Sequence, residues 1–292
     1  MFRGAITAIV TPFKADYSID FDALDRLIDF QLEQGIEGII PCGSTGEAIT
    51  QTLEERCAVI EHTVKRVSER VPVLAGTGGS STAEVVEATA RARKLGADGA
   101  LINTPAYNRP QQEGLYLHYA AVAKATPGFP IMLYNIPGRT AVNMNTEVMV
   151  RLCNDYPQSF VAYKDATANL KQTEEVLRLT PLVVLSGDDG LTLPMISMGA
   201  QGIVSVVANV APKAIRQLSD LSRAGKLKEA AALNHKLAPL IDACFVESNP
   251  VPSKAALHLM GKCGPTARLP LAPISEKSLA VVRKALSDFA IL

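Results

Sequence analysis

The sequence has no excess of either charge. Its 292 residues include 29 basic and 29 acidic side chains, so the formal net charge at pH 7 is zero, and no basic run stands out. Proteins that bind nucleic acid or anionic membranes present clustered lysine and arginine to phosphate groups. The balanced composition gives no indication of a nucleic-acid or membrane partner.

Long apolar runs are also missing. No uninterrupted apolar stretch reaches the ~18 residues typical of a membrane-spanning helix. The chain opens with Met-Phe-Arg-Gly and then an apolar strand-like run, which is not the pattern of a secretory signal. We therefore expect a cytoplasmic protein.

Cysteine and histidine form no recognisable ligand or disulfide pattern. The four histidines lie far apart without an H-E-x-x-H motif, and the five cysteines are widely spaced without a C-x-x-C pair. These features predict no disulfide framework, no metal site and a reducing compartment, and they disfavour a metal-assisted aldolase. We expect no cofactor. We interpret Cys42, beside a polar loop without an evident base, as a core residue.

The sequence does contain a regular alternation of apolar strand-like runs and helical patterns. Hydrophobic residues make up 48% of the chain, enough for a large core. Each strand-like run lacks strict alternation, as expected when both faces of a sheet are covered. The eight runs span residues 5–10, 38–41, 71–75, 99–103, 131–135, 160–164, 183–186 and 203–207.

A glycine phrase recurs where predicted helices lead into strands, beginning at Gly35, Gly96 and Gly199. Its first glycine suits the left-handed end of a helix, and a second glycine three residues later allows close packing into the strand. The copies imply roughly 26 to 30 residues for each strand–helix unit, which predicts a (β/α)8 TIM barrel of the α/β class. A doubly wound open sheet is the alternative, but no dinucleotide fingerprint supports it.

Helical patterns also end the chain. After about Arg223 the alternation stops, and helices are expected over residues 227–247, 253–260 and 275–290. We therefore predict a catalytic barrel over residues 1–224 and a C-terminal helical region over residues 225–292, packed on the barrel.

One lysine lies near the end of the sixth predicted strand. Lys164 shares a strand face with Ala162, while Asp165 points the other way. Apolar neighbours favour the neutral amine, and lowering its pKa from ~10.4 to ~7.5 requires about 4 kcal/mol. A neutral lysine amine attacks carbonyl groups and forms Schiff bases. The alternative is a lysine that reaches solvent at the strand end.

The loop after the second predicted strand reads Gly-Ser-Thr-Gly-Glu, residues 43–47. Its backbone N–H groups and the hydroxyls of Ser44 and Thr45 would form a concavity for a small anion, and a carboxylate is the best candidate. The loop lacks the Gly-Lys-Ser/Thr ending of a phosphate-binding P-loop. An ordinary helix N-cap turn remains the alternative.

Three further candidate site residues lie at the ends of the fourth and fifth predicted strands or in the loops that follow them. Tyr107 could relay a proton or could anchor its loop. Tyr134 ends a strand beside that of Lys164, so its phenol can face the same barrel mouth. Arg139 follows a Pro-Gly turn at the rim, where it could hold a carboxylate in bidentate fashion or remain a surface arginine.

Two aspartates, Asp188 and Asp189, follow the seventh predicted strand. Paired carboxylates there could bind a metal or a substrate, or either one could cap the following helix. Both interpretations stay open from the residues alone.

Four of these stretches together resemble the pyruvate-dependent class I aldolase superfamily. They are the GSTGE loop, the loop of Tyr107, the segment YNIPGRT over residues 134–140 and the strand Tyr-Lys-Asp-Ala over residues 163–166. The similarity runs through essentially the whole chain, including the helical tail. Within the superfamily, the Pro-Gly-Arg-Thr continuation is typical of the dihydrodipicolinate synthase family.

The resemblance implies a role for each candidate residue. Lys164 would form the Schiff base with pyruvate, and Thr45 with adjoining backbone would hold the pyruvate carboxylate. Tyr134 would shuttle protons beside the carbonyl. Ser44 and Tyr107 would complete the proton relay, with Tyr107 reaching in from a neighbouring subunit.

The same resemblance implies the second substrate and the assembly. Arg139 would clamp the carboxylate of L-aspartate 4-semialdehyde, and the backbone near Val204 would line the pyruvate site. The product would be 4-hydroxy-tetrahydrodipicolinate, of the diaminopimelate and lysine biosynthesis pathway. Members of the family are usually homotetramers built as dimers of dimers.

Two departures from the family pattern matter. Relatives commonly carry threonine where this chain has Ser44, and the hydroxyl survives that change. Lysine-sensitive members have a feedback site for lysine at the subunit interface. At four positions of that site they tend to carry residues other than those of this chain, whereas Glu84 agrees with them. Those positions are Leu53, Arg56, Ser80 and Ala106. We therefore predict weak or absent inhibition by lysine.

Two alternative functions compete with the synthase. A sibling aldolase that cleaves a 2-keto-3-deoxy sugar acid would use the same Schiff base, but Arg139 argues against it. A non-catalytic keto-acid sensor on a decayed barrel is disfavoured because Lys164, Tyr134, Tyr107 and Arg139 are all present.

Overall fold

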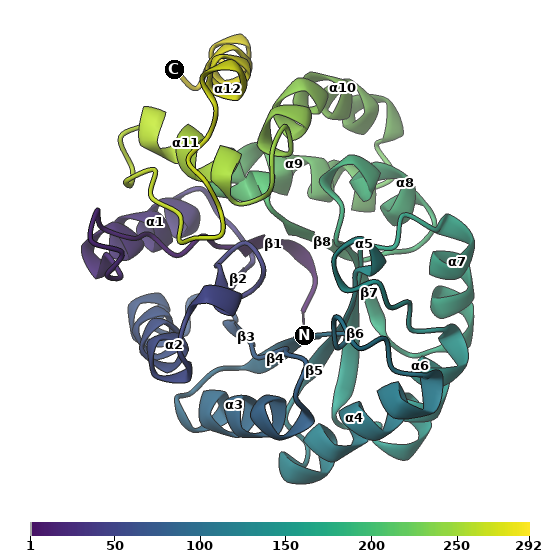
Figure 1. Cartoon of the computed structure of the whole chain (residues 1–292). Helices are drawn as coiled ribbons and strands as arrows, with labels where there is room; N and C mark the ends of the chain where they lie inside the picture. The colour runs from purple at the N-terminus through teal and green to yellow at the C-terminus, as the bar shows by residue number, and fades with distance from the viewer. Residues whose placement is uncertain (1) are drawn as a thin grey trace.

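The structure, a computed structural model, describes residues 2–292. Within this range eight parallel strands form a sheet at the centre of the molecule, and helices surround it (Figure 1). The strands are β1 (Gly4–Ala8), β2 (Gly38–Ile40), β3 (Leu74–Gly76), β4 (Gly99–Asn103), β5 (Ile131–Asn135), β6 (Phe160–Asp165), β7 (Val183–Ser186) and β8 (Gly202–Ser205).

The sheet closes into a barrel. Its strands follow the order β2-β1-β8-β7-β6-β5-β4-β3, so β1 lies between β2 and β8. The two ends of that order meet at a parallel bridge between Ile39 and Val73, and the Ile39 N–H donates to Pro72 O at 3.0 Å. The predicted TIM barrel is therefore confirmed, and the open doubly wound alternative is wrong.

All eight strands were predicted, and only their ends differ. The third was expected from residue 71 but begins at Leu74. Pro72 has no N–H for the ladder, and the N–H of Val73 donates to the Asp98 carboxylate at 2.8 Å instead. The eighth ends at Ser205 because Val207–Asn209 forms a 3₁₀ turn, η3.

Helices follow the strands, and most of them surround the barrel (Figure 1). Their bounds are α1 (Phe21–Glu33), η1 (Ala48–Thr50), α2 (Leu53–Val67), α3 (Thr82–Lys94), α4 (Gln112–Ala125), α5 (Pro137–Thr140), α6 (Thr146–Asp155), α7 (Leu170–Leu179), η2 (Asp189–Leu191), α8 (Thr192–Ser197) and α9 (Pro212–Arg223). The four-residue α5, by contrast, lies inside the ring of helices in Figure 1.

The recurring glycine phrase has the predicted geometry. Gly35, Gly96 and Gly199 have φ angles of 79°, 88° and 119°, in the range that favours glycine. The second glycine packs into the strand: a Cβ on Gly202 would lie 2.0 Å from the carbonyl oxygen of Gly4. At these three corners the glycines therefore allow the helix to end and the chain to pass closely into the next strand.

Two apolar cores result from this arrangement. One fills the space between the sheet and its helices. The other fills the inside of the barrel and contains Ile6, Leu101 and Met132 together with Tyr134 and Val204. Two predicted site residues thus belong to the interior of the barrel.

Three further helices form the C-terminal region, α10 (Leu227–Cys244), α11 (Val251–Leu259) and α12 (Glu276–Asp288). All three were predicted, with ends that differ by up to three residues. Figure 1 shows α11 between α1 and α10, at the edge of the barrel beside β1 and β2. The C-terminal region is therefore packed on the barrel close to the loop after β2.

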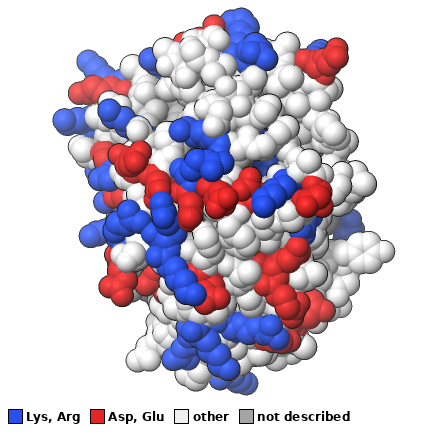
Figure 2. Space-filling model, turned by 90° about the vertical axis from the view of Figure 1, so that its left-hand side faces the viewer, with Lys and Arg blue, Asp and Glu red and all other residues white. Residues whose placement is uncertain are grey.

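The surface reflects the balanced composition. Figure 2 shows basic and acidic side chains interspersed on the face that carries α1 and α2, where Arg66 pairs with Asp29. Among residues 2–292, the helices are all too short or too polar to cross a membrane.

Candidate active site

Lys164 projects into the barrel beside a tyrosine. It lies on β6 in register with Tyr134 on the neighbouring strand β5. Its Nζ is 4.2 Å from the centre of the Tyr134 ring, and only 4% of the lysine surface is exposed. The alternative of a lysine that reaches solvent is therefore wrong.

The orientation of the strand is as predicted. Lys164 shares the interior face with buried Ala162. Asp165 points outward, where its carboxylate accepts hydrogen bonds from the hydroxyls of Thr167 and Thr173, both at 2.7 Å. Asp165 is therefore not a partner of the ammonium.

Burial decides the charge state of Lys164. It lowers the pKa of the amine to about 7, with Asp189 acting in the opposite direction and Arg139 adding to the decrease. A substantial fraction of the amine is thus neutral near pH 7. That fraction can act as a nucleophile toward a carbonyl group.

Tyr134 keeps its proton over the whole range in which the lysine titrates. Burial raises the pKa of the Tyr134 phenol to about 12, while Arg139 and a hydrogen bond with Ser44 act to lower it. The phenol can therefore donate a proton beside the amine and accept one back. Ser44 lies in the loop after β2, so that loop reaches Tyr134 on β5.

The loop over residues 43–47 is tightly fixed. The Gly46 carbonyl oxygen accepts hydrogen bonds from Thr11 Oγ1 at 2.7 Å and Gln51 Nε2 at 2.6 Å. The N–H of Glu47 donates to Ser44 O at 3.2 Å, which closes a turn around Thr45. Thr45 is buried, whereas Ser44 is exposed.

Asn249, a residue that sequence analysis did not identify, connects this loop to Arg139. Its Nδ2 donates to Thr45 Oγ1 at 3.0 Å, and its carbonyl oxygen accepts from Arg139 Nη2 at 3.1 Å. Asn249 is 6% exposed and lies just before α11. No motif surrounds it, so only its position in the fold distinguishes it.

Arg139 lies at the rim as predicted. It belongs to the four-residue helix α5, which begins at Pro137 directly after β5. Arg139 is exposed, and its charge acts on the pKa values of both Lys164 and Tyr134. It can therefore hold an anion at the barrel mouth.

Tyr107 is separate from this group in the single chain. Its side chain is 95% exposed, and its φ of 75° lies in the left-handed region. The chain therefore presents this phenol outward, away from the buried Lys164.

The neighbouring residues Asp188 and Asp189 differ in their hydrogen-bond partners and in their burial. Asp188 accepts from the Gly190 N–H at 2.9 Å and caps η2, as one interpretation proposed. Asp189 is 1% exposed and accepts from the Ser205 hydroxyl and from the Val206 N–H at 3.0 Å. Burial raises the pKa of Asp189 to about 6.

These contacts fix the exit of β8 beside the lysine. Val204 is fully buried on β8 and pairs with Ile6 of β1. Since Asp189 accepts hydrogen bonds from the two residues that follow Val204, it joins the loop after β7 to the end of β8. Sequence analysis noted Asp189 but not this contact.

Gly187 lies against the stem of Lys164. A Cβ at this position would be 3.0 Å from both Cγ and Cε of the lysine and 2.9 Å from the Cβ of Ala166. The absent side chain thus leaves the space that the lysine stem occupies. Sequence analysis missed this role, although a glycine directly after a barrel strand was a signal.

Comparison with known proteins gives matches along the whole chain. The model of the Dihydrodipicolinate synthetase family matches residues 1–289. The 4-hydroxy-tetrahydrodipicolinate synthase of Geobacter sp. (strain M21) is 49% identical over 294 aligned residues, and the match covers all of both chains.

Solved structures agree with the sequence matches. Dihydrodipicolinate synthase from Aquifex aeolicus superposes with a TM-score of 0.97 at 40% identity over 99% of each chain. The chloride-inhibited dihydrodipicolinate synthase from Acinetobacter baumannii, complexed with pyruvate, superposes with a TM-score of 0.96 at 41% identity over all of both chains. The likeness includes the C-terminal helical region.

Proposed function

The chain belongs to the dihydrodipicolinate synthetase family, and we propose that it condenses pyruvate with L-aspartate 4-semialdehyde to 4-hydroxy-tetrahydrodipicolinate. It is an enzyme of the lyase class, as its full-length relatives are named synthases of that product. The single observation that carries the proposal is the buried Lys164 amine, with its pKa near 7, beside the Tyr134 phenol.

The first step is addition of the neutral Lys164 amine to the keto carbon of pyruvate. Loss of water gives an imine between Nζ and that carbon. Tyr134 supplies a proton to the departing hydroxyl and receives one back, since its pKa of about 12 keeps it protonated beforehand. The Tyr134 phenolate then accepts a proton from the methyl group, which restores the phenol and converts the imine into a nucleophilic enamine.

The enamine carbon next attacks the aldehyde of the second substrate, which forms the carbon–carbon bond. The amino group of that substrate then adds to the imine carbon, closes the ring and releases Lys164. The enzyme thus returns to its starting state. No oxidant or reductant is required in this sequence.

Two carboxylates need binding sites in this mechanism. Thr45 and the N–H groups of its loop are proposed to hold the carboxylate of pyruvate, with the backbone at Val204 lining the same site. Support comes from the buried Thr45 hydroxyl, the interior position of Val204 and the relative complexed with pyruvate. Arg139 is proposed to bind the carboxylate of aspartate semialdehyde at the rim.

Tyr107 is proposed to act in the site of a second copy, in relay with Ser44 and Tyr134. Its 95% exposure and its outward position support this interpretation, because a buried Tyr107 could not reach another chain. The proposed assembly is a homotetramer built as a dimer of dimers. Analytical ultracentrifugation and a Tyr107→Phe assay would test the assembly and the relay.

The sugar-acid aldolase is not supported as an alternative. The full-length relatives carry the name of the synthase, and Arg139 is present at the rim. We further propose a cytoplasmic location, which agrees with five cysteines that remain free thiols within residues 2–292.

Borohydride reduction in the presence of pyruvate tests the proposal most directly. The intact chain should gain one reduced pyruvate on Lys164 by mass spectrometry, and Lys164→Ala should gain none. The same preparation should consume aspartate semialdehyde only together with pyruvate. Absence of the adduct, or faster cleavage of sialic acid or ketodeoxygluconate, would overturn the assignment.

A further inference from the structure

A buried ion pair joins the loop over residues 43–47 to the C-terminal region. Glu47, the last residue of the loop, is 2% exposed and has a left-handed φ of 55°. Its carboxylate pairs with the ammonium of Lys254 on α11, whose side chain is fully buried. It also accepts a hydrogen bond from the backbone N–H of Arg268 at 2.9 Å.

Lys254 has no freedom to act as a second nucleophile. Besides the contact with Glu47, its Nζ donates to the Thr266 carbonyl oxygen at 2.8 Å and lies 4.2 Å from the centre of the Phe13 ring. The ammonium is therefore enclosed by a carboxylate, a carbonyl group and an aromatic face. The role of Lys254 is therefore structural, and its amine does not act as a nucleophile.

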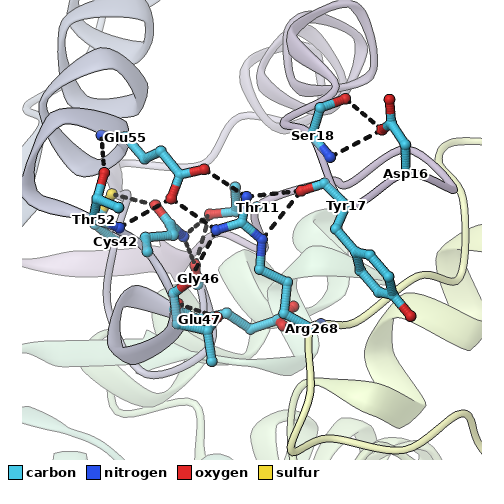
Figure 3. A network of polar contacts seen from close by, with 12 residues as sticks. Thr11, Asp16, Tyr17, Ser18, Cys42, Gly46, Glu47, Thr52, Glu55 and Arg268 are labelled. Atoms are coloured by element: carbon cyan, nitrogen blue, oxygen red, sulfur yellow. Dashed lines mark hydrogen bonds and ion pairs between the residues drawn. The ribbon is translucent and has the colours of Figure 1, made fainter.

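Arg268 extends the same connection to three further segments (Figure 3). Its guanidinium pairs with the Glu55 carboxylate at 2.6 and 2.8 Å, and it donates to the carbonyl oxygens of Thr50 and Tyr17 at 2.9 and 2.7 Å. Figure 3 shows Arg268 between Glu47, Glu55 and Tyr17. One side chain thus spans the end of the loop, the start of α2 and the segment before α1.

Stability alone does not explain a fully buried pair. Two desolvated charges in contact are frequently no more stabilising than apolar residues of the same volume, while loss of one partner leaves the other charge unpaired. What a pair does provide is a defined geometry between the two elements that carry it. Here those elements are α11 and the loop that carries Ser44 and Thr45.

The turn geometry transmits any displacement of Glu47 to these two residues. Since the Glu47 N–H donates to Ser44 O and the Gly46 carbonyl is held by two side chains, the turn is a single rigid unit. Asn249 holds Thr45 from the same direction. The C-terminal region therefore contacts the loop at two residues, Thr45 and Glu47.

We propose that residues 249–268, here called the C-terminal clamp, position the Ser44–Thr45 loop to bind the carboxylate of the keto acid, with Lys254 and Arg268 as positioning residues that act through Glu47. The inference rests on the proposed function, since it assigns Lys254 and Arg268, through Glu47, to the pyruvate side of that reaction. It predicts that loss of the contacts with Glu47 weakens pyruvate binding, while Lys164 still forms the Schiff base at saturating pyruvate.

The test compares two variants of the C-terminal region. Lys254→Met removes the buried cation and keeps an apolar stem of similar length. Leu286→Ala, in α12, removes a fully buried side chain of the same region that has no polar contact with the loop. Thermal unfolding of both variants allows comparison at a temperature where each remains folded.

The readout is the pyruvate concentration that gives half-maximal borohydride trapping on Lys164. For Lys254→Met it should increase by roughly 10- to 100-fold, as expected when a distant change displaces a binding group. Trapping at saturating pyruvate should persist, and the KM for aspartate semialdehyde should change by less than about threefold. Leu286→Ala should keep the pyruvate dependence of the unchanged chain.

Glu47→Gln provides a second test if Lys254→Met does not fold. It keeps the size of the side chain and an acceptor for the Arg268 N–H but removes the charge, so the same selective increase is expected. Equal pyruvate dependence in Glu47→Gln or Lys254→Met and in Leu286→Ala would overturn the clamp. Absence of trapping in the unchanged chain would instead overturn the proposed function, which keeps the two failures distinct.

Discussion

Lys164 and Tyr134 face each other across two neighbouring strands of the barrel, with the lysine Nζ 4.2 Å from the centre of the phenol ring. The amine has a pKa lowered to about 7 and the phenol a pKa raised to about 12. Burial acts in opposite directions on the two groups because it favours the neutral form of each. Near neutral pH the pair therefore offers a nucleophile and a proton donor at once.

The pH dependence of pyruvate capture follows from these two values. We expect kcat/KM for pyruvate to increase with pH through a midpoint near 7, because the protonated amine below that pH has no free electron pair. No decrease from Tyr134 is expected until the pH approaches its pKa of about 12. Initial rates in buffers of constant ionic strength would check both limbs. A profile that is flat between pH 6 and 8 would contradict the assignment of Lys164.

Lys164 should also reduce the stability of the fold near neutral pH. In the unfolded chain its pKa is near 10.5, so between pH 7 and 10.5 the unfolded state binds a proton that the folded state does not. The stability contribution of Lys164 therefore improves as pH increases through this window, and it is least favourable below pH 7. The difference corresponds to roughly 5 kcal/mol, at about 1.4 kcal/mol for each pKa unit.

The variant Lys164→Met tests this linkage. It should be more stable than the unchanged chain at pH 7, by roughly 2 to 5 kcal/mol, and the gain should shrink as pH approaches 10. Urea unfolding of both chains at several pH values measures the gain. A gain that is constant with pH would mean that the lysine is not neutralised by folding.

Asp189 should set the midpoint of the activity profile. Its charge raises the pKa of Lys164, so Asp189→Asn should move the midpoint to lower pH, by about one unit. Asp188→Asn is the matched control, because Asp188 caps η2 and does not act on the lysine. The same shift in both variants would show that the effect is not specific to Asp189.

Gly187 should be intolerant of a side chain. A Cβ there would lie 3.0 Å from two carbons of the Lys164 stem, so Gly187→Ala should displace the amine and slow borohydride trapping by roughly 10- to 100-fold. Gly114→Ala, within helix α4, serves as the control for a glycine replacement away from the site. An unchanged trapping rate in Gly187→Ala would show that the lysine stem can move aside.

Inhibition by L-lysine is expected to be weak or absent. The chain has Leu53 and Arg56 at two positions where lysine-sensitive relatives tend to carry histidine, and the guanidinium of Arg56 would repel a cationic ligand. Ser80 and Ala106, two further departures, lie together: the serine hydroxyl donates to the alanine carbonyl oxygen at 3.2 Å. Steady-state rates with increasing L-lysine test this, and a sub-millimolar inhibition constant would contradict it.

Several features of this protein follow from the sequence by itself, because they depend on local periodicity. The apolar runs predict eight buried strands, and the glycines at positions 35, 96 and 199 predict the corners between helices and strands. The two-residue period of a strand places Lys164 on the face of Ala162 and directs Asp165 away. Neighbours a few residues apart suffice for each of these conclusions.

Only the tertiary structure decided what surrounds the lysine and how its loops are held. The contact of Asn249 with Thr45 joins residues 204 positions apart, and the contact of Lys254 with Glu47 joins α11 to the loop after β2. The pKa of Lys164 depends on burial that exists only once the barrel has closed. Closure and the docking of the C-terminal region bring together distant parts of the chain, and no local pattern encodes such distances.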